Sequence, residues 1–149
     1  MAYKDLREWM AKLQSEGELK EITAKVDWNL ELAEIARKGI KEHKPALLFT
    51  NIKDHEKTTC TRLLTNVLAT KGRMALGLGL PAKTSLGELI QIVRKRWRNP
   101  MTPVMVKTGP VKENILTGDD IDLFKFPVPK WHEHDGGRYI GAGHMVINS

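Results

Sequence analysis

The chain has 149 residues, of which 41% are hydrophobic and 28% are charged, with one cysteine and a formal net charge of +6. These values are typical of a globular domain, or of one domain plus the opening strands of a second, and they exclude a disordered tail or a disulfide-stapled secreted fold. No run approaches the ~18 apolar residues that a membrane-spanning helix needs. Because residues 1–10 are also charged and amphipathic rather than typical of a signal sequence, we expect a cytoplasmic protein that does not enter a membrane.

Basic residues are concentrated in the middle of the chain. Residues 44–112 contain 13 Lys and Arg against 3 Asp and Glu, whereas residues 1–43 contain 8 against 9 and residues 113–149 contain 3 against 6. Such a segment either forms a solvated basic face or binds an anionic ligand or nucleic acid. Because no recognition motif accompanies the charge, we favour the solvated face and expect no nucleic-acid partner.

The first fifty residues alternate between helix and strand patterns. Residues 5–16 carry apolar side chains at helical spacing, and Gly17 supplies the left-handed residue that commonly ends a helix. Residues 19–26 and 46–49 are predicted strands.

A second helix is predicted between these strands. Asp27 or Asn29 is its candidate N-cap, and it ends before Pro45. Its inner face would be formed by Leu32, Ile35, Ala36 and Ile40.

The same alternation continues to residue 98. Residues 62–68 predict a strand, and residues 71–78 predict a short helix that Thr70 opens. The strongest helix signal is at residues 85–98, where Ser85 and Glu88 have the spacing of a capping box. The face expected to be buried consists of Leu86, Leu89, Ile90, Val93 and Trp97.

The pattern changes at Pro100. Five of the seven prolines lie at or after this residue, together with short β-rich runs such as residues 104–106, and no helical period follows. We therefore predict an α/β domain at residues 1–105 and a second unit at residues 106–149. Residues 139–147 predict a strand, and because a domain seldom ends on an uncovered strand, we expect the chain to be part of a longer polypeptide.

Three groups of residues could carry chemistry, and each has a simpler interpretation. His132 and His134 would share a face of a strand, as two metal ligands do, but no second Cys, His or Asp group follows at matching spacing, and the neighbouring glycines predict a loop. The basic run at residues 94–98 could bind nucleic-acid phosphates. However, Trp97 is expected to be buried, and the helix dipole favours cations in the last turn of a helix, which is a sufficient structural explanation. Cys60 is expected to be a buried structural thiol. The residues alone thus predict no metal site and no named reaction.

Several segments, in order along the chain, resemble the UbiD-type decarboxylases, which depend on prenylated flavin. They are residues 3–9 with 17–19, 45–52, 73–79 and 126–140. The last is the most specific, because its prolines are followed by the run Asp-Gly-Gly-Arg-Tyr-Ile at residues 135–140, which leads the family into its flavin-binding domain. The chain therefore resembles the N-terminal third of this family along its whole length.

The resemblance implies an architecture and an activity. The expected fold class is α/β (α+β), with an N-terminal mixed α/β domain followed by the first strands of a split β-barrel that binds flavin. Family members reversibly decarboxylate small aromatic or α,β-unsaturated carboxylic acids with prenylated FMN, Mn2+ and K+. A C-terminal domain that mediates oligomerisation implies a homo-oligomer for the full-length protein.

The resemblance also implies that the chemistry is located elsewhere. The metal ligands and the Glu–Arg–Glu acid–base network of the family would lie after Ser149, so we expect no catalytic residue here and no activity from the 149 residues alone. Ile140, Gly141, Ala142 and Gly143 match the strand that approaches flavin and substrate, and we assign them to the pocket edge. The small residues beside Ala142 either leave room for a ring or allow close strand packing.

Two roles are compatible with these expectations. In one, the chain is the N-terminal part of a decarboxylase whose partner is the remainder of the same polypeptide or a companion subunit. In the other, it is a stand-alone, non-catalytic accessory or binding module that retains only the N-terminal domain of the family.

Overall fold

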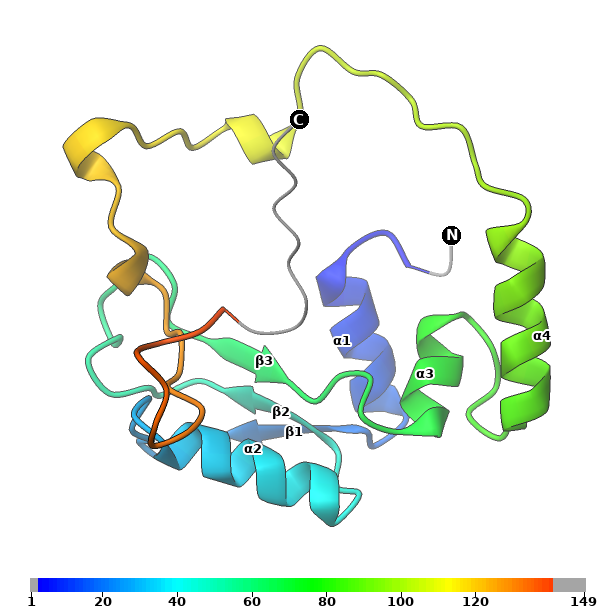
Figure 1. The fold of residues 1–149 in the computed structure, drawn as a ribbon, viewed down its shortest axis with the longest axis horizontal. Coiled ribbons are helices and arrows are strands. Elements are labelled where there is room, and N and C mark those ends of the chain that lie inside the picture. Colours follow the sequence, from blue (N-terminus) through cyan, green and yellow to red (C-terminus); the bar gives the residue numbers. More distant parts are fainter. Residues whose placement is uncertain (1–2, 141–149) are drawn as a thin grey trace.

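The computed structural model describes residues 3–140, which form a mixed α/β unit followed by a long irregular segment (Figure 1). The elements are α1 (Leu6–Ser15), β1 (Leu19–Ile22), α2 (Glu31–Lys41), β2 (Ala46–Phe49), β3 (Leu63–Thr65), α3 (Lys71–Gly77) and α4 (Leu86–Trp97). All seven occur in the predicted order, and the mixed α/β class is confirmed. The predicted strands at 19–26 and 62–68 are longer than β1 and β3, which pair over only a few residues.

A three-stranded sheet of order β1-β2-β3 lies at the centre of the unit. β1 and β2 are parallel, with Leu19 opposite Ala46, as expected when a helix such as α2 connects two neighbouring strands. β3 is antiparallel to β2, with Leu47 opposite Thr65. β3 therefore forms one edge of the sheet.

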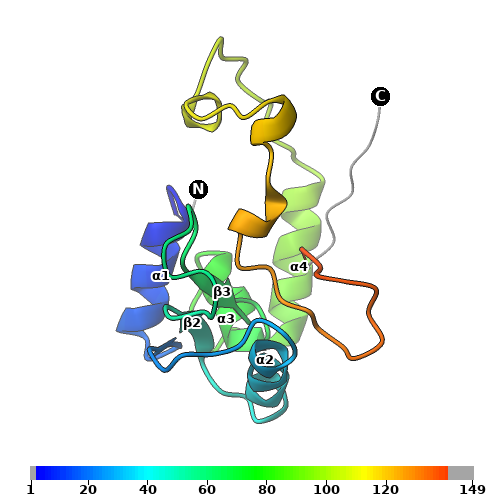
Figure 2. The ribbon, with the colours of Figure 1, turned by 90° about the vertical axis from the view of Figure 1, so that its left-hand side faces the viewer.

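Two helices cover opposite faces of this sheet (Figure 2). Side chains alternate between the faces of a strand, so Leu47 and Phe49 pack with Leu32 of α2. Ala46 faces the other way and packs with Leu13 of α1. The alternation within β2 thus creates two small cores.

Local capping signals in the sequence are confirmed. Gly17 has a φ of 71° just after α1, Thr70 accepts a hydrogen bond from the backbone of Arg73, and Ser85 and Glu88 form both bonds of a capping box. The predicted cap of α2 is wrong, because Leu30 occupies the N-cap position without a side-chain bond.

The two candidate caps of α2 have other roles. The Asp27 carboxylate accepts a hydrogen bond from the Asn29 backbone and forms an ion pair with Lys53 at 2.6 Å. The predicted inner face of α2 is also partly wrong, because Ile40 is exposed while Ala33 and Gly39 are buried. The helix thus packs through small residues, and the Asn66 side chain lies against Gly39.

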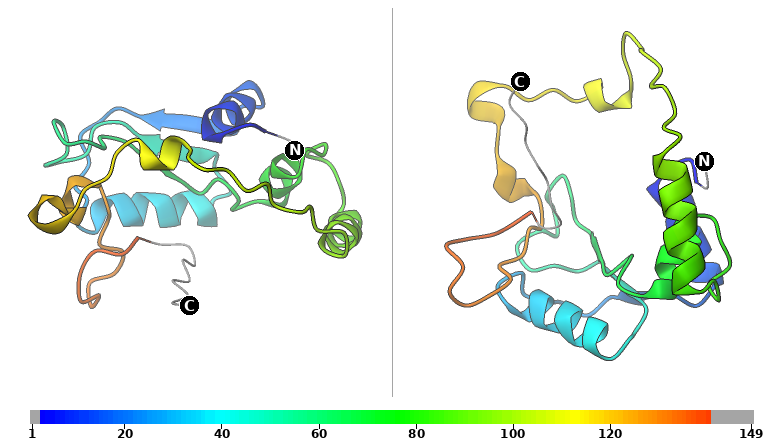
Figure 3. Two further views of the ribbon diagram at one scale, coloured as in Figure 1. Left: turned by 90° about the horizontal axis from the view of Figure 1, so that it is seen from above. Right: turned by 45° about the vertical axis from the view of Figure 1, so that its right-hand side comes forward.

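Helix α4 differs most from its prediction. Leu89 is its one buried residue, whereas Ile90 and Val93 are exposed and Trp97 is 84% exposed. Figures 1 and 3 show α4 beside α3, at the margin of the unit. Within residues 3–140, only a narrow strip of the helix is covered, so an apolar face that is evident in the sequence stays exposed.

Beyond Pro100 the chain leaves α4 as an extended arm and returns to the α/β unit, where Lys130 forms a bridge with Asn29 (Figure 3). Three short 3-10 turns interrupt it, at Pro110–Lys112, Gly118–Asp120 and Leu123–Lys125. The β-rich run at residues 104–106 is exposed and irregular, contrary to the strand pattern of its sequence. Across 101–140 the structure has a single isolated bridge, at Lys130. Of the predicted strand 139–147, Tyr139 and Ile140 are irregular and the rest lies outside the described residues.

Candidate functional site

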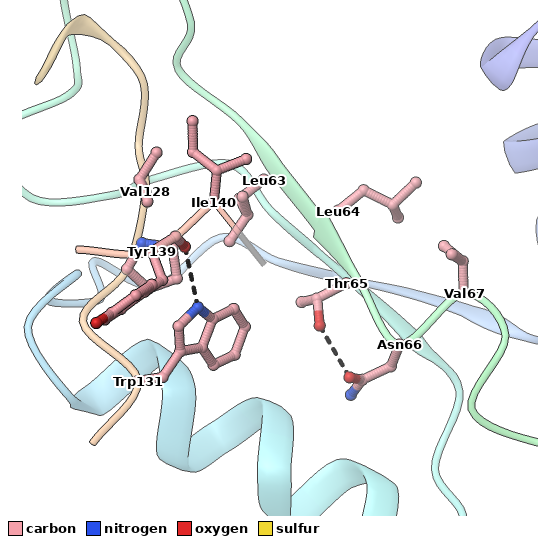
Figure 4. Close-up of a pocket in the computed structure, with 10 residues that line it drawn as sticks. Leu63, Leu64, Thr65, Asn66, Val67, Val128, Trp131, Tyr139 and Ile140 are labelled. Carbon is pink, nitrogen blue, oxygen red and sulfur yellow. Dashed lines mark hydrogen bonds between the residues drawn. The ribbon is translucent and has the colours of Figure 1, made fainter. Parts of the chain in front are cut away.

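An apolar pocket of about 540 Å³ lies where the returning segment meets β3 (Figure 4). One wall comes from β3 and the two residues that follow it, and the other from residues 128–140. The lining residues are Leu63, Leu64, Thr65, Asn66, Val67, Val128, Pro129, Trp131, Tyr139 and Ile140. None of these side chains carries a formal charge, so the pocket is suited to an apolar, uncharged group.

The returning segment is attached to the α/β unit through its backbone. The amide of Lys130 donates to the carbonyl of Trp28 at 3.1 Å, and the amide of Leu30 donates to the carbonyl of Lys130 at 3.2 Å. Pro127 and Pro129 are buried beside this bridge. Residue 130 is therefore fixed relative to the start of α2.

The loop that follows closes on itself. The amide of Tyr139 donates to the carbonyl of Pro129 at 3.2 Å, and the indole N–H of Trp131 donates to the carbonyl of Tyr139 at 3.1 Å (Figure 4). These two bonds bring the ends of the 129–139 loop together. As a result, Tyr139 and Ile140 lie at the pocket, next to Trp131.

Thr65 and Asn66, two polar side chains of the pocket, are hydrogen-bonded within the protein. Thr65 Oγ1 donates to Asn66 Oδ1 at 2.8 Å, and Asn66 Nδ2 donates to the carbonyl of Ala36 at 2.9 Å. Asn66 has a φ of 63°, in the left-handed region that Asn tolerates better than most residues. These contacts orient Asn66 as part of the wall and leave van der Waals contact as the main interaction that the pocket offers.

Arg138 of the 129–139 loop contacts side chains of two distant segments. The guanidinium carbon of Arg138 is 3.5 Å from the centre of the Trp28 ring and 5.2 Å from that of Phe124. Its Nη1 is 3.3 Å from Nε2 of His55, a side chain that is only 2% exposed. Burial of His55, and then the charge of Arg138, lower the pKa of this imidazole, against the opposing effect of Asp54 and Glu56.

Sequence reasoning did not identify these contacts. Trp28, His55 and Arg138 come from three distant segments, and no short-range spacing connects them. A signal in the sequence was the position of Arg138 in the Asp-Gly-Gly-Arg-Tyr-Ile run, which indicates the family but not the contacts of the side chain.

The residues predicted from the sequence are placed as follows. Ile140 lines the pocket, whereas Gly141, Ala142 and Gly143 lie outside the described residues. His132 is exposed, with Nδ1 3.6 Å from an Asp135 carboxylate oxygen. Among residues 3–140, no three His, Cys, Asp or Glu side chains are grouped so that they could hold a metal ion.

Two further predictions need correction. Trp97 was expected to be buried, but it is exposed beside the cations of α4. Burial of this tryptophan is therefore no argument against a binding role for the basic run. Cys60 is partly exposed rather than buried, and its thiol donates to the carbonyl of Arg62. Within the part of the chain that the structure describes, no helix has the length and apolar character needed to cross a membrane.

Two family models match the chain in succession. Residues 10–93 match the N-terminal domain of 3-octaprenyl-4-hydroxybenzoate carboxy-lyase, called UbiD_N, and residues 103–149 match the Rift-related domain of the same family, called UbiD.

Characterised relatives extend this match. The chain is 35% identical to the pyrrole-2-carboxylic acid decarboxylase of Pseudomonas aeruginosa over 97% of its length, and 36% identical to a phenolic acid decarboxylase of Streptomyces sp. over 98%. In both cases it spans 31% of the relative. The chain therefore spans about a third of the length of these relatives.

Solved structures share the fold. A vanillic acid decarboxylase of Sedimentibacter hydroxybenzoicus, in an open form, superposes with a TM-score of 0.80 at 34% identity, covering 91% of this chain and 30% of that one. A UbiD-class enzyme of Pelotomaculum thermopropionicum, in an evolved dimeric form with prFMN bound, gives a TM-score of 0.74 at 30% identity, covering 94% and 31%.

Proposed function

The chain belongs to the UbiD family of carboxy-lyases, and from this premise we propose that it is the N-terminal part of a prenylated-FMN-dependent decarboxylase. The reaction is the reversible release of carbon dioxide from a small aromatic or α,β-unsaturated carboxylic acid. The observation that carries this proposal is the succession of the two family models over residues 10–93 and 103–149. The relatives' decarboxylase activities support the same reaction class.

The division of the chain follows from the same premise. Residues 1–105 are the N-terminal α/β domain, and residues 106–149 begin the split β-barrel that binds flavin. The gap between the two family matches, at residues 94–102, supports a boundary close to this position. The exposed, irregular arm at residues 106–126 is the part of the barrel that packs against later segments of the polypeptide.

The apolar pocket fits one portion of the cofactor site. Its uncharged lining suits the face of a ring system but offers no cation for a phosphate. Ile140, with Gly141, Ala142 and Gly143 after it, would form the edge against which the ring of cofactor or substrate lies. Bound prenylated FMN would supply the electron sink that decarboxylation requires. The chain itself contributes orientation and the exclusion of water, while Mn2+, K+ and the acid–base groups are held by other parts of the protein.

The first experiment assays the complete natural polypeptide with prenylated FMN, Mn2+ and K+ against benzoic-, pyrrole- and cinnamic-type acids, and measures carbon dioxide release. We expect turnover of at least one acid. Residues 1–149 alone should show no turnover and should not retain flavin through gel filtration. Turnover by these residues alone would show that the chemistry lies within them.

A pair of variants tests the pocket edge. Ile140→Trp places bulk at the pocket, and Ile115→Trp makes the same change on the exposed arm, where Ile115 is 71% exposed. In the complete protein, only Ile140→Trp should raise KM, because it narrows the space for the ring. Equal effects of the two changes would remove Ile140 from the site. An inactive complete polypeptide, together with a stable complex between this chain and a separate subunit, would instead support the accessory-module role.

A further inference from the structure

Arg138 immediately precedes the two residues that the 129–139 loop delivers to the pocket. The anchor on the other side of the loop is Lys130, whose amide donates to the carbonyl of Trp28. The guanidinium of Arg138 stacks on the indole of that same tryptophan at 3.5 Å. Both ends of the loop therefore converge on Trp28, one through the backbone and one through a side chain.

Trp28 is itself held in place. Its indole N–H donates to a carboxylate oxygen of Asp54 at 3.1 Å, which sets the orientation of the ring. The ring face is thus presented to Arg138 in one arrangement. A guanidinium over a tryptophan face is the most favourable cation–π geometry available to an arginine.

His55 fixes the other side of the guanidinium. Arginine remains protonated in proteins and can only donate, so Nη1 needs an acceptor lone pair on His55 Nε2, 3.3 Å away. The imidazole is therefore neutral, with its proton on Nδ1, which is 3.4 Å from Thr58 Oγ1. The low exposure of His55 favours this neutral form.

We propose that Arg138 is a positioning residue, which holds Tyr139 and Ile140 at the apolar pocket by clamping the 129–139 loop between Trp28 and neutral His55. The link to substrate binding rests on the proposed function, whereas the clamp itself rests on the contacts alone. Without the clamp, the two bonds that close the loop, Tyr139 to Pro129 and Trp131 to Tyr139, lose their neighbouring support. Ile140 then no longer has a defined position.

Amide hydrogen exchange in the 149-residue chain tests the clamp directly. In Arg138→Ala, the amide of Tyr139 should exchange about ten-fold faster, because its hydrogen bond to the carbonyl of Pro129 opens more often without the support of Arg138. The amide of Ala46, which donates to Glu18 in the core, should be unchanged. Arg138→Lys should restore only part of the protection, since an ammonium cannot stack and donate with the planar geometry of a guanidinium. Unchanged exchange at Tyr139 would overturn the proposal, as would an equal rise at Ala46, which would indicate general destabilisation.

Two substitutions at His55 give a matched control. Glutamine places its amide oxygen near the position of Nε2 and can accept from Arg138, whereas leucine cannot. His55→Leu should therefore raise Tyr139 exchange, but less than Arg138→Ala, which also removes the stacking on Trp28, and His55→Gln should raise it little. Adding His55→Leu to Arg138→Ala should raise exchange almost no further, because Arg138→Ala already removes the contact with His55. Equal effects of the Gln and Leu variants, or full additivity, would contradict the clamp.

A pH series separates the clamp from simple packing. The charged groups that face His55 are Arg138, Asp54 and Glu56. Protonation of His55 puts a second N–H opposite Arg138, so protection at Tyr139, corrected for intrinsic exchange, should fall as the pH drops below the ordinary histidine pKa of about 6.5. The fall should be absent in His55→Gln. A wild-type profile identical to that of His55→Gln would count against the proposal.

The activity measurement then addresses the consequence for binding. In the complete decarboxylase, Arg138→Ala should raise KM for the acid several-fold more than it lowers kcat, with partial rescue by Arg138→Lys. If exchange shows the clamp but no acid is decarboxylated, the proposed function fails and the clamp stands. If the acid is decarboxylated and Arg138→Ala leaves both KM and Tyr139 exchange unchanged, the clamp fails and the proposed function stands.

Discussion

The guanidinium of Arg73, on α3, donates from Nη1 to the carboxylate of Glu18 at 2.6 Å and so connects segments 55 residues apart. The same side chain donates to the carbonyls of Lys44 and Asn66, each at 3.1 Å. Arg73 is fully buried, whereas the side chain of Glu18 is 36% exposed. One arginine thus joins α3 to the residues that precede β1 and β2 and to the residue that follows β3.

The first prediction concerns this junction. Arg73→Ala should lower the free energy of unfolding by about 3–5 kcal/mol, because a partner is removed from a buried, charge-assisted network. Glu18→Gln should cost about 1 kcal/mol or less, since glutamine can still accept and the site is partly solvated. Urea denaturation of both variants measures the difference. An Arg73→Ala cost below about 1 kcal/mol would show that the network contributes little.

The second prediction compares two tryptophans. Trp9 is 8% exposed and packs in the core between α1 and the sheet, whereas Trp97 is 84% exposed on α4. In the 149-residue chain, Trp9→Ala should cost about 3–5 kcal/mol, the usual range for a large core aromatic. Trp97→Ala should cost less than about 1 kcal/mol. Denaturant midpoints distinguish the two, and a Trp97→Ala cost above about 2 kcal/mol would place this residue in a core.

The third prediction is a pH dependence of stability due to His55. Its pKa is lowered in the fold, first by burial and then by the charge of Arg138. The unfolded chain therefore binds more protons in this range, and the stability due to the neutral imidazole is complete above the ordinary pKa of about 6.5. It is lost as the pH falls through the lowered, folded-state pKa. Between about pH 7 and 5, the free energy of unfolding should depend less on pH in His55→Gln than in the wild-type chain. An unaltered pH dependence would contradict this assignment.

The fourth prediction concerns the basic run of α4. Arg94, Arg96 and Arg98 should mediate only weak, sequence-independent association with nucleic acid, because counterion release is the only driving force that scattered surface cations provide. Fluorescence anisotropy with labelled duplexes at two salt concentrations would measure it. Submicromolar binding at ~0.15 M salt, abolished when the three arginines become alanine, would show a specific interface that includes the exposed Trp97.

The sequence was sufficient wherever the deciding interaction is short in range. The caps at Thr70 and Ser85 and the left-handed Gly17 were predicted correctly, because a cap and the amide that it accepts from lie within three residues of each other. The strand at residues 46–49 was likewise evident as a short apolar run. Family membership could also be inferred from ordered local segments, and the two matched domains confirm it.

Long-range contacts decided the rest. The amphipathic pattern of α4 identifies an apolar face, but only the tertiary arrangement shows that Leu89 is covered and Trp97 is not. The partners of Arg138 lie 83 and 110 residues away, so no spacing in the chain could place it over Trp28 or beside His55. Composition and periodicity determine which side chains favour burial or pairing, because those preferences belong to each residue and its near neighbours. Which of them are buried or paired depends on segments that only folding brings together.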